Sequence, residues 1–291
     1  MDSRTPIPAR PAIGRRTSWR DPETFDRYGE LPPPFAVPRP LADPLLLAVQ
    51  EVYDTTADSY DGHYVDAVAE AEHRLVRTAL SALLRAMRPG RLVVDLGCGT
   101  GLALQILPEL APDGYLGLDI SHGMLDQARA KYPDHRFVWA DLRRPIFRPL
   151  LNDQPLGLLL SLFGAVCYQP DPLACLDRLL DEWPDAALAV ILFGPTYEPR
   201  APEPRATRLA AHELGAWLAG REQHREGALW AFSPRGCSLL VERVQWLLER
   251  VMPRRFATRL LTPIAHRLLE DAAFDRAGYF LVILGPERRD G

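Results

Sequence analysis

Three glycines at alternate positions, with an acidic residue ahead of them, are the residues of this chain whose types and spacing best indicate chemistry. In VVDLGCGTG, residues 93–101, Gly97, Gly99 and Gly101 follow an apolar run and Asp95. Glycine loses more backbone freedom on folding than any other residue, so this spacing indicates a sharp turn or a close approach to a ligand. A turn alone needs only one glycine. The spacing therefore favours a ligand, which in an open α/β sheet lies at the carboxyl ends of the strands.

Two kinds of ligand compete for such a loop. A dinucleotide site uses the spacing G-x-G-x-x-G, which lets a pyrophosphate rest on a helix N-terminus. Here the third glycine comes one residue early, and Leu102 occupies the last position of that fingerprint. A carboxylate at Asp95 would repel a pyrophosphate but would attract an ammonium group. The loop therefore favours a cofactor that carries an amino acid.

The elements that must position this loop alternate between short apolar runs and helical patterns. Buried strands are predicted at residues 91–96, 115–120, 136–142, 156–162, 186–194 and 279–286, and ALWAF at 228–232 offers one more. Helical patterns separate most of these runs. Short apolar strands that alternate with helices predict an α/β fold with a doubly wound, mostly parallel sheet.

Composition divides the chain of 291 residues into four segments. Residues 1–45 are rich in proline and arginine and are expected to form a poorly ordered tail, with a docked lid as the alternative. Residues 46–195 carry the strand–helix alternation and are expected to bind the cofactor. Residues 196–275 are mainly helical and are expected to be an insertion that covers the substrate. Residues 276–291 are expected to supply the final strand of the core sheet.

Composition and charge exclude several functional classes. The chain is 47% hydrophobic and 25% charged with a formal net charge of −4, which argues against a general nucleic-acid binder. Its four cysteines and seven histidines lack metal-ligand spacing, so we expect neither a metal nor a disulfide framework. We find no secretory signal and no apolar run of about 18 residues, and so expect a cytoplasmic protein without a membrane partner.

With these elements in place, VVDLGCGTG resembles the D-x-G-x-G-x-G motif of class I S-adenosylmethionine-dependent methyltransferases. LGLDIS, WADL and SLFGAVCYQPDP follow in the order of that family. VYDTTADSYD, residues 52–61, resembles the Y-D-x-x-A-x-x-Y-D opening of many members that methylate small molecules. The resemblance covers about residues 50–195 and the last strand. It implies a seven-stranded Rossmann-like sheet with an antiparallel last strand, S-adenosylmethionine as cofactor and S-adenosylhomocysteine as product.

The resemblance also implies a role for each residue of a cofactor site. The loop glycines and Cys98 would pass beside the methionine part of the cofactor, and Asp95 would lie near its ammonium group or order water around it. Asp119 would accept both ribose hydroxyls, although a dehydrogenase keeps an acid at a similar place. The remaining implied residues contact the adenine (Ile120, Met124, Asp141 and Leu142), line the methionine end (Ser161 and Leu162) or close the pocket (Tyr53 and Tyr60). Ordinary helix packing is the alternative for the two tyrosines.

The sequence offers no fixed catalytic motif. Because a sulfonium methyl group is already activated, such an enzyme needs mainly to align a nucleophile and exclude water. We expect methyl transfer to an oxygen or nitrogen of a small organic molecule, with secondary metabolism as the expected setting. The alternatives are a protein that binds the cofactor without transferring methyl groups and an NAD-dependent oxidoreductase. Residues that would serve as a base, each with a surface role as the alternative, are His63, Tyr168, His212, Glu213 and His224.

Overall fold

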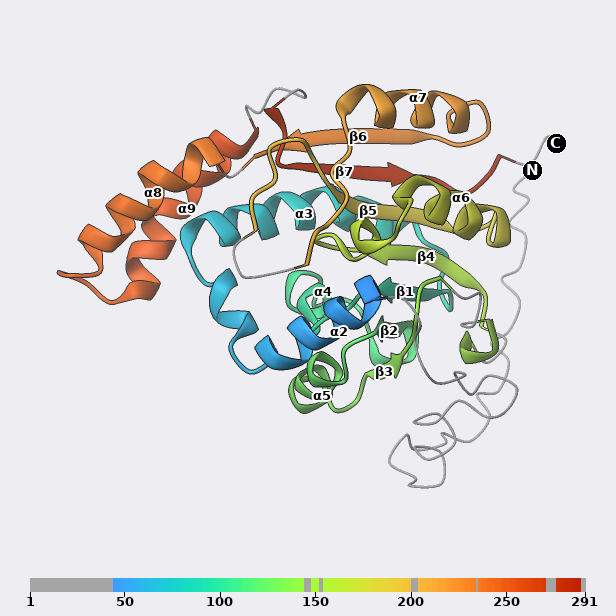
Figure 1. Ribbon diagram of the computed structural model, residues 1–291, viewed down its shortest axis with the longest axis horizontal. Coiled ribbons are helices and arrows are strands. Elements are labelled where there is room, and N and C mark those ends of the chain that lie inside the picture. Colours follow the sequence, from blue (N-terminus) through green and yellow to red (C-terminus); the bar gives the residue numbers. More distant parts are fainter. Residues whose placement is uncertain are drawn as a thin grey trace, which may run out of the picture. The chain divides into compact units, whose positions relative to one another are not determined.

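The computed structural model contains a seven-stranded sheet with helices on both faces (Figure 1). The structure describes residues 44–143, 148–151, 154–199, 204–233, 235–270 and 276–288. The strands are β1 (Leu92–Leu96), β2 (Tyr115–Asp119), β3 (Arg136–Trp139), β4 (Leu156–Ser161), β5 (Ala187–Phe193), β6 (Gly227–Phe232) and β7 (Tyr279–Leu284). Their order is β3-β2-β1-β4-β5-β7-β6. Strands β1 to β5 are parallel, and β7 is antiparallel to both β5 and β6. The predicted doubly wound sheet with an antiparallel last strand is confirmed.

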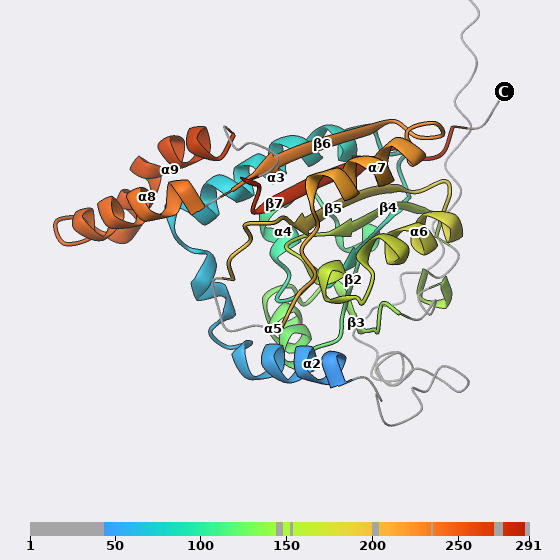
Figure 2. The same ribbon diagram turned by 45° about the horizontal axis from the view of Figure 1, so that its top comes forward.

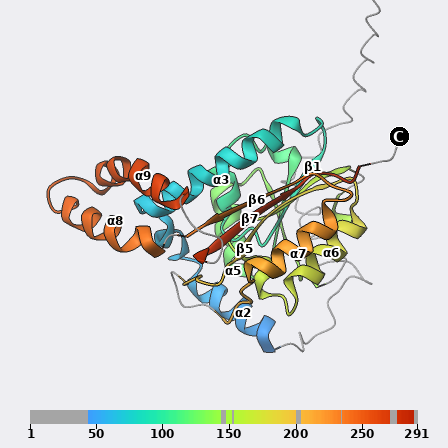
Figure 3. The same cartoon turned by 90° about the horizontal axis from the view of Figure 1, so that it is seen from above.

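The strand order reverses between β1 and β4, and this reversal decides on which face of the sheet the connecting helices lie. They are α2 (Pro44–Thr56), α3 (Ala67–Ala86), α4 (Leu102–Ile106), α5 (His122–Lys131), α6 (Pro172–Glu182), α7 (Ala211–Arg221), α8 (Arg235–Leu248) and α9 (Arg254–Glu270), with 3₁₀ turns η1 (Tyr60–Tyr64), η2 (Pro112–Gly114), η3 (Arg148–Leu151) and η4 (Ala165–Tyr168). Right-handed crossovers put α4 and α5 on one face and α6 and α7 on the other. Helix α3 packs against α4, and Figure 3 shows it across the sheet from α6 and α7.

The central strands are buried along their whole length because helices cover both faces of the sheet. Every residue of β1, β4 and β5 is buried, which explains why these strands read as continuous apolar runs. Side-chain caps fix where the neighbouring helices begin: Asp66, Ser121 and Asp171 each accept a hydrogen bond from the backbone N–H three residues later. The sequence thereby sets the position of α3, α5 and α6 against the sheet.

Residues 196–275 contain α7, β6, α8 and α9. Strand β6 pairs with β7 along its length, from Gly227 opposite Leu284 to Phe232 opposite Tyr279, so this part of the segment belongs to the sheet itself. Helices α8 and α9 pack on each other and on α3, and form a hairpin beyond the end of the sheet (Figure 2). A substrate cover in this segment stays a prediction. The predicted tail, up to residue 43, lies outside the described residues.

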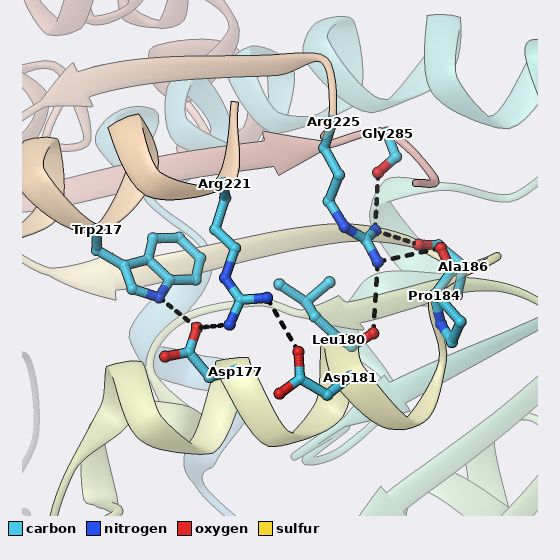
Figure 4. A network of polar contacts seen from close by, with 9 residues as sticks. All are labelled: Asp177, Leu180, Asp181, Pro184, Ala186, Trp217, Arg221, Arg225 and Gly285. Carbon is cyan, nitrogen blue, oxygen red and sulfur yellow. Dashed lines mark hydrogen bonds and ion pairs between the residues drawn. The ribbon is translucent and has the colours of Figure 1, made fainter. Parts of the chain in front are cut away.

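Two arginines fix α7 and β6 to α6 (Figure 4). Arg221, at the end of α7, donates to Asp177 at 2.6 Å and to Asp181 at 3.0 Å. Arg225, which is buried, donates to four backbone carbonyl oxygens, those of Leu180, Pro184, Ala186 and Gly285. Buried carbonyl groups require such partners. The network holds the antiparallel end of the sheet against α6.

Candidate functional site

The glycine loop leaves β1 at the carboxyl edge of the sheet, and its middle glycine has a different structural reason from the outer two. Gly97, Gly99 and Gly101 have φ of 74°, 52° and 89°, in the left-handed region that favours glycine. A Cβ atom at Gly97 would lie 2.0 Å from the Cβ of Ala165, and one at Gly101 would lie 2.8 Å from the ring of Tyr132. A Cβ atom at Gly99 would meet nothing within 4 Å. Close packing therefore requires the outer two glycines, whereas Gly99 faces open space.

That open space is a cavity with a free volume of about 80 Å³ at the carboxyl ends of the central strands. The lining combines bare backbone of the glycine loop, a carboxylate, and many apolar and aromatic side chains. Its residues are Leu46, Val49, Tyr53, Tyr60, Gly97, Gly99, Asp119, Ile120, Met124, Ala140, Leu142, Leu162, Phe163, Ala165, Tyr168 and Gln169.

Asp119, at the end of β2, presents its carboxylate to the cavity and also holds the loop. Its Oδ2 accepts the N–H of Gly99 at 2.8 Å, and its Oδ1 accepts the N–H of Ser121 at 2.9 Å. Burial raises the pKa of Asp119, and these backbone N–H groups offset part of the rise because they stabilise the ionised form. The side chain thus joins the glycine loop to the start of α5.

The predicted N-terminal motif folds over the cavity with its two tyrosines facing inward. Tyr53 of α2 and Tyr60 of η1 both line the cavity. Their rings meet edge to face, with centroids 5.9 Å apart. The hydroxyl of Tyr53 also lies 2.8 Å from the hydroxyl of Tyr168, which enters from η4. The tyrosines therefore form a wall shared by the N-terminal segment and the segment after β4.

Two aspartates of the same motif, Asp54 and Asp61, accept hydrogen bonds from α5 and from the glycine loop and so hold that wall in place. Asp54 Oδ1 accepts the hydroxyl of Ser121 at 2.6 Å and the N–H of Gly123 at 2.9 Å, both at the start of α5. A Cβ atom at Gly123 would lie 2.9 Å from the carbonyl oxygen of Asp54, so this glycine allows α2 to approach closely. Asp61 accepts the hydroxyl of Thr100, which lies in the glycine loop itself, at 2.5 Å.

Removal of the Asp54 carboxylate is expected to loosen α2. Asp54→Ala leaves the Gly123 N–H without its acceptor, and hydrogen bonds to charged groups contribute about 1.5–3 kcal/mol. We expect faster amide hydrogen exchange across residues 44–56, measured by mass spectrometry. Asp58→Ala is the matched control, because Asp58 is exposed and bonds only the Gln127 side chain among the contacts seen. Equal exchange in the two variants would contradict the tethering role of Asp54.

Five residues predicted for the site do not line the cavity. The carboxylate of Asp95 lies behind the loop and accepts the hydroxyl of Tyr115 at 2.6 Å. Asp141 pairs with Arg143 at 2.8 Å. The hydroxyl of Ser161 donates to a β1 carbonyl at 2.8 Å. The other two are Cys98, which is buried, and Gly101, which packs on a tyrosine ring. These residues support the walls of the cavity, and the roles that the resemblance implies for them at the cofactor stay predictions.

Sequence reasoning missed several lining residues that reach the cavity from distant segments. Phe163 has φ of 57°, the one positive φ outside glycine in the described part of the chain. Strained backbone of this kind is often found at functional sites. No sequence signal marks it beyond its place after the β4 run. The other residues missed are Leu46, Val49, Ala140, Ala165 and Gln169, while Tyr168 was considered only as a base.

The burial of Asp95 makes stability depend on pH. Desolvation raises the pKa of Asp95 to about 7, against an ordinary 3.8. Because the folded state then binds the proton more tightly than the unfolded chain, the contribution of Asp95 to stability falls as pH rises from about 4 through 7. Asp95→Asn keeps an acceptor for Tyr115 and removes the charge. Between about pH 5.5 and 8, we expect the free energy of unfolding of the parent to fall by about 2 kcal/mol more than that of the variant. Urea unfolding at each pH measures this difference. Parallel pH profiles would contradict this assignment.

Comparison with known proteins gives one family and one fold. Residues 93–181 match the family model described as a methyltransferase domain. Trans-aconitate 2-methyltransferase of Acidovorax sp. (strain JS42) is 45% identical over 75 residues, covering 25% of this chain and 28% of that protein. The protein of the same name from Methylobacterium nodulans is 35% identical over 147 residues, covering 43% of this chain and 55% of that protein. The chain thus spans about a quarter to about half of the length of these curated relatives.

Among solved structures, magnesium protoporphyrin IX methyltransferase from Synechocystis PCC 6803, solved with bound SAM, has the same fold. The TM-score is 0.52 at 16% identity, and the alignment covers 84% of this chain and 99% of that chain. At this identity the likeness concerns the fold alone. It agrees with the strand order and with the antiparallel position of β7.

Proposed function

We propose that this chain, a member of the class I S-adenosylmethionine-dependent methyltransferases, transfers a methyl group to a carboxylate oxygen of a small organic acid. S-adenosylmethionine would be the methyl donor. The observation that carries this proposal is the cavity at the carboxyl ends of the central strands, walled by bare loop backbone, by Asp119 and by tyrosines. This is the edge at which open α/β sheets bind ligands.

The residues of the cavity fit the parts of the cofactor. Bare backbone at Gly99 opens on the cavity, so a ligand can approach the loop closely. Asp119 has acceptor capacity beyond its two backbone N–H bonds, and this capacity suits the hydroxyls of a ribose. Ile120, Met124 and Leu142 offer an apolar surface for a purine. When bound, S-adenosylmethionine supplies an electrophilic methyl group on a positively charged sulfur.

The chemistry of the lining favours an acceptor that is already ionised. No described lining residue is a histidine or a lysine, and the ionisable groups present are Asp119 and three tyrosines. An alcohol would need a base to become a good nucleophile, whereas a carboxylate carries its charge at neutral pH. The protein's own contribution would then be to orient the acid against the methyl group and to exclude water, for which Tyr53, Tyr60 and Tyr168 are positioned.

A second hollow next to the cavity offers positive charge for such an acid. Its lining includes Arg205 and Arg208. It also includes Pro170, the chain neighbour of Gln169 in the cavity lining. Within the described part of the chain, neither arginine forms a hydrogen bond or ion pair. Arginine binds carboxylates through two parallel hydrogen bonds, so these side chains would hold carboxylates of the acceptor that do not react.

The names of the relatives support the same class of acceptor. Trans-aconitate is a tricarboxylate whose only heteroatoms are carboxylate oxygens, so a methyltransferase named for it forms an ester. Because only part of each relative aligns with this chain, we extend to it the class of acceptor and not the particular acid.

The experiment is a transfer assay with methyl-labelled S-adenosylmethionine and a panel of acceptors. Trans-aconitate and other di- and tricarboxylates are compared with alcohols and amines of similar size. A methyl ester releases labelled methanol in mild base, whereas an ether or a methylamine does not. We expect base-labile label on an organic acid. Base-stable label would assign a hydroxyl or nitrogen acceptor instead, and cofactor binding without transfer to any acceptor would indicate a binding protein.

Substitution of the two arginines tests how the acid is held. Arg205→Gln with Arg208→Gln is expected to raise KM for the acid at least tenfold and to leave cofactor affinity unchanged, since about 1.4 kcal/mol corresponds to each tenfold step. Arg77→Gln, an exposed arginine on α3, serves as the control for loss of surface charge. An unchanged KM in the double variant would show that this hollow does not bind the acid.

A further inference from the structure

Exposed apolar side chains gather on the hairpin of α8 and α9. Eleven large hydrophobic residues of the described part are exposed, and eight of them lie on this hairpin or its turn. They are Leu240, Trp246, Leu247, Val251, Phe256, Leu260, Ile264 and Leu268. Single exposed apolar residues are normal, but a gathering of this kind marks an interaction surface.

The spacing of most of these residues puts them on an exposed stripe of each helix. In α9, Phe256, Leu260 and Ile264 each directly precede a residue buried against the neighbouring helices, at positions 257, 261 and 265. In α8, Leu240 likewise precedes a buried residue, Val241, and Leu247 follows it at helical spacing. We call these residues the apolar face of the hairpin.

The same hairpin carries concentrated positive charge. Residues 240–269 hold six arginines and two glutamates, whereas the whole chain has a net charge of −4. The guanidinium of Arg250 lies 3.7 Å from the ring centroid of Trp246, and that of Arg255 lies 5.0 Å from the ring centroid of Phe256. Exposed aromatic and leucine side chains beside arginines are the composition of helices that lie in the interface of a bilayer.

The hairpin is fixed to the rest of the protein, so whatever binds it also holds the methyltransferase domain. Helix α9 packs along α3. Gln245 Oε1 of α8 accepts the N–H of Ala67 at the start of α3 at 3.0 Å. Figure 3 shows the hairpin beyond one end of the sheet, away from α6 and α7. Its apolar face is therefore not covered by the other helices of the described part.

We propose that the α8–α9 hairpin docks this protein on membrane surfaces that contain anionic phospholipids. Lipid headgroups of negative charge complement the arginines, and the apolar face enters the boundary between headgroups and acyl chains. A second copy of the chain would bring two cationic surfaces together, which charge disfavours. The hairpin would lie on the membrane and not cross it, since among the described helices none has the length and apolar character of a spanning helix.

Co-sedimentation with lipid vesicles tests this proposal. The full chain is mixed with vesicles of phosphatidylcholine alone or with about 30 mol% phosphatidylglycerol, at low and high salt. We expect binding to the anionic vesicles that weakens with salt. Arg255→Gln with Arg259→Gln is expected to weaken partitioning at least tenfold, because each arginine near an anionic surface contributes about fivefold. Leu260→Glu with Ile264→Glu is expected to abolish it.

Val65→Glu is the control, because Val65 is exposed to a similar degree (45%, against 58% and 51% for Leu260 and Ile264) and lies outside the hairpin. Circular dichroism checks that all variants fold. Equal binding to neutral and anionic vesicles would overturn the proposal, as would unchanged binding by Leu260→Glu with Ile264→Glu. Absence of vesicle binding, together with a dimer that these substitutions dissociate, would overturn it in favour of a second copy.

Discussion

Gly99→Ala is expected to weaken binding of S-adenosylhomocysteine by more than tenfold without unfolding the protein. The added methyl group meets no protein atom within 4 Å, because it points into the cavity that Gly99 lines. It would therefore occupy space that the ligand needs. The φ of 52° adds backbone strain, about 1–2 kcal/mol for an L-residue in the left-handed region. Isothermal titration calorimetry gives the affinity, and urea unfolding gives the stability.

Gly90→Ala separates the two effects of that substitution. Gly90 has φ of 80°, and a Cβ atom there would likewise meet nothing within 4 Å, but Gly90 lies between α3 and β1, away from the cavity lining. We expect Gly90→Ala to lose a similar amount of stability and to bind the ligand normally. If Gly99→Ala also binds normally, the ligand does not lie against the loop.

Asp119→Ala is expected to weaken cofactor binding by about 1–3 kcal/mol, or roughly fivefold to 150-fold. The substitution removes the acceptor proposed for the ribose hydroxyls and also releases the N–H groups of Gly99 and Ser121. Asp119→Asn keeps one carbonyl oxygen and is expected to lie between the parent and the alanine variant. Asp126→Ala, on the exposed side of α5, is the control. An unchanged dissociation constant in Asp119→Ala would contradict the ribose role.

The same carboxylate predicts how binding depends on pH. Burial raises the pKa of Asp119, so the charged acceptor is lost at a higher pH than for an ordinary aspartate. We expect affinity to decline as the pH is lowered toward that range, and Asp119→Asn to show a flatter profile. Calorimetry across pH measures both.

The fold was predictable because parallel strands with both faces covered read as uninterrupted apolar runs. LVVDL, LGLLLS and ALAVILF are buried at every residue, and the caps at Ser121 and Asp171 mark the helix starts that follow two of the strands. Strand β6 was harder to predict, because at the edge of the sheet its residues are mostly exposed or half-buried, and so its sequence lacks a clear pattern.

The candidate site was predictable in position and less so in detail. Sequence places Asp95 and Asp141 at strand ends but does not tell which way a side chain turns, and Tyr115 and Arg143 engage them away from the cavity. Leu46 and Val49 were missed because they reach the cavity from a helix distant in sequence. Residues 256, 260 and 264 have the spacing of a buried stripe, and periodicity cannot distinguish a core face from an exposed one.

A crystal structure of the protein grown with S-adenosylhomocysteine would show whether the cavity at the glycine loop is the cofactor site. We expect the nucleoside in the cavity at the carboxyl ends of β1, β2 and β4, with the amino-acid part along Gly97 and Gly99 and the ribose hydroxyls on Asp119. A nucleoside found elsewhere on the protein, or a cavity that stays empty at saturating ligand, would contradict it.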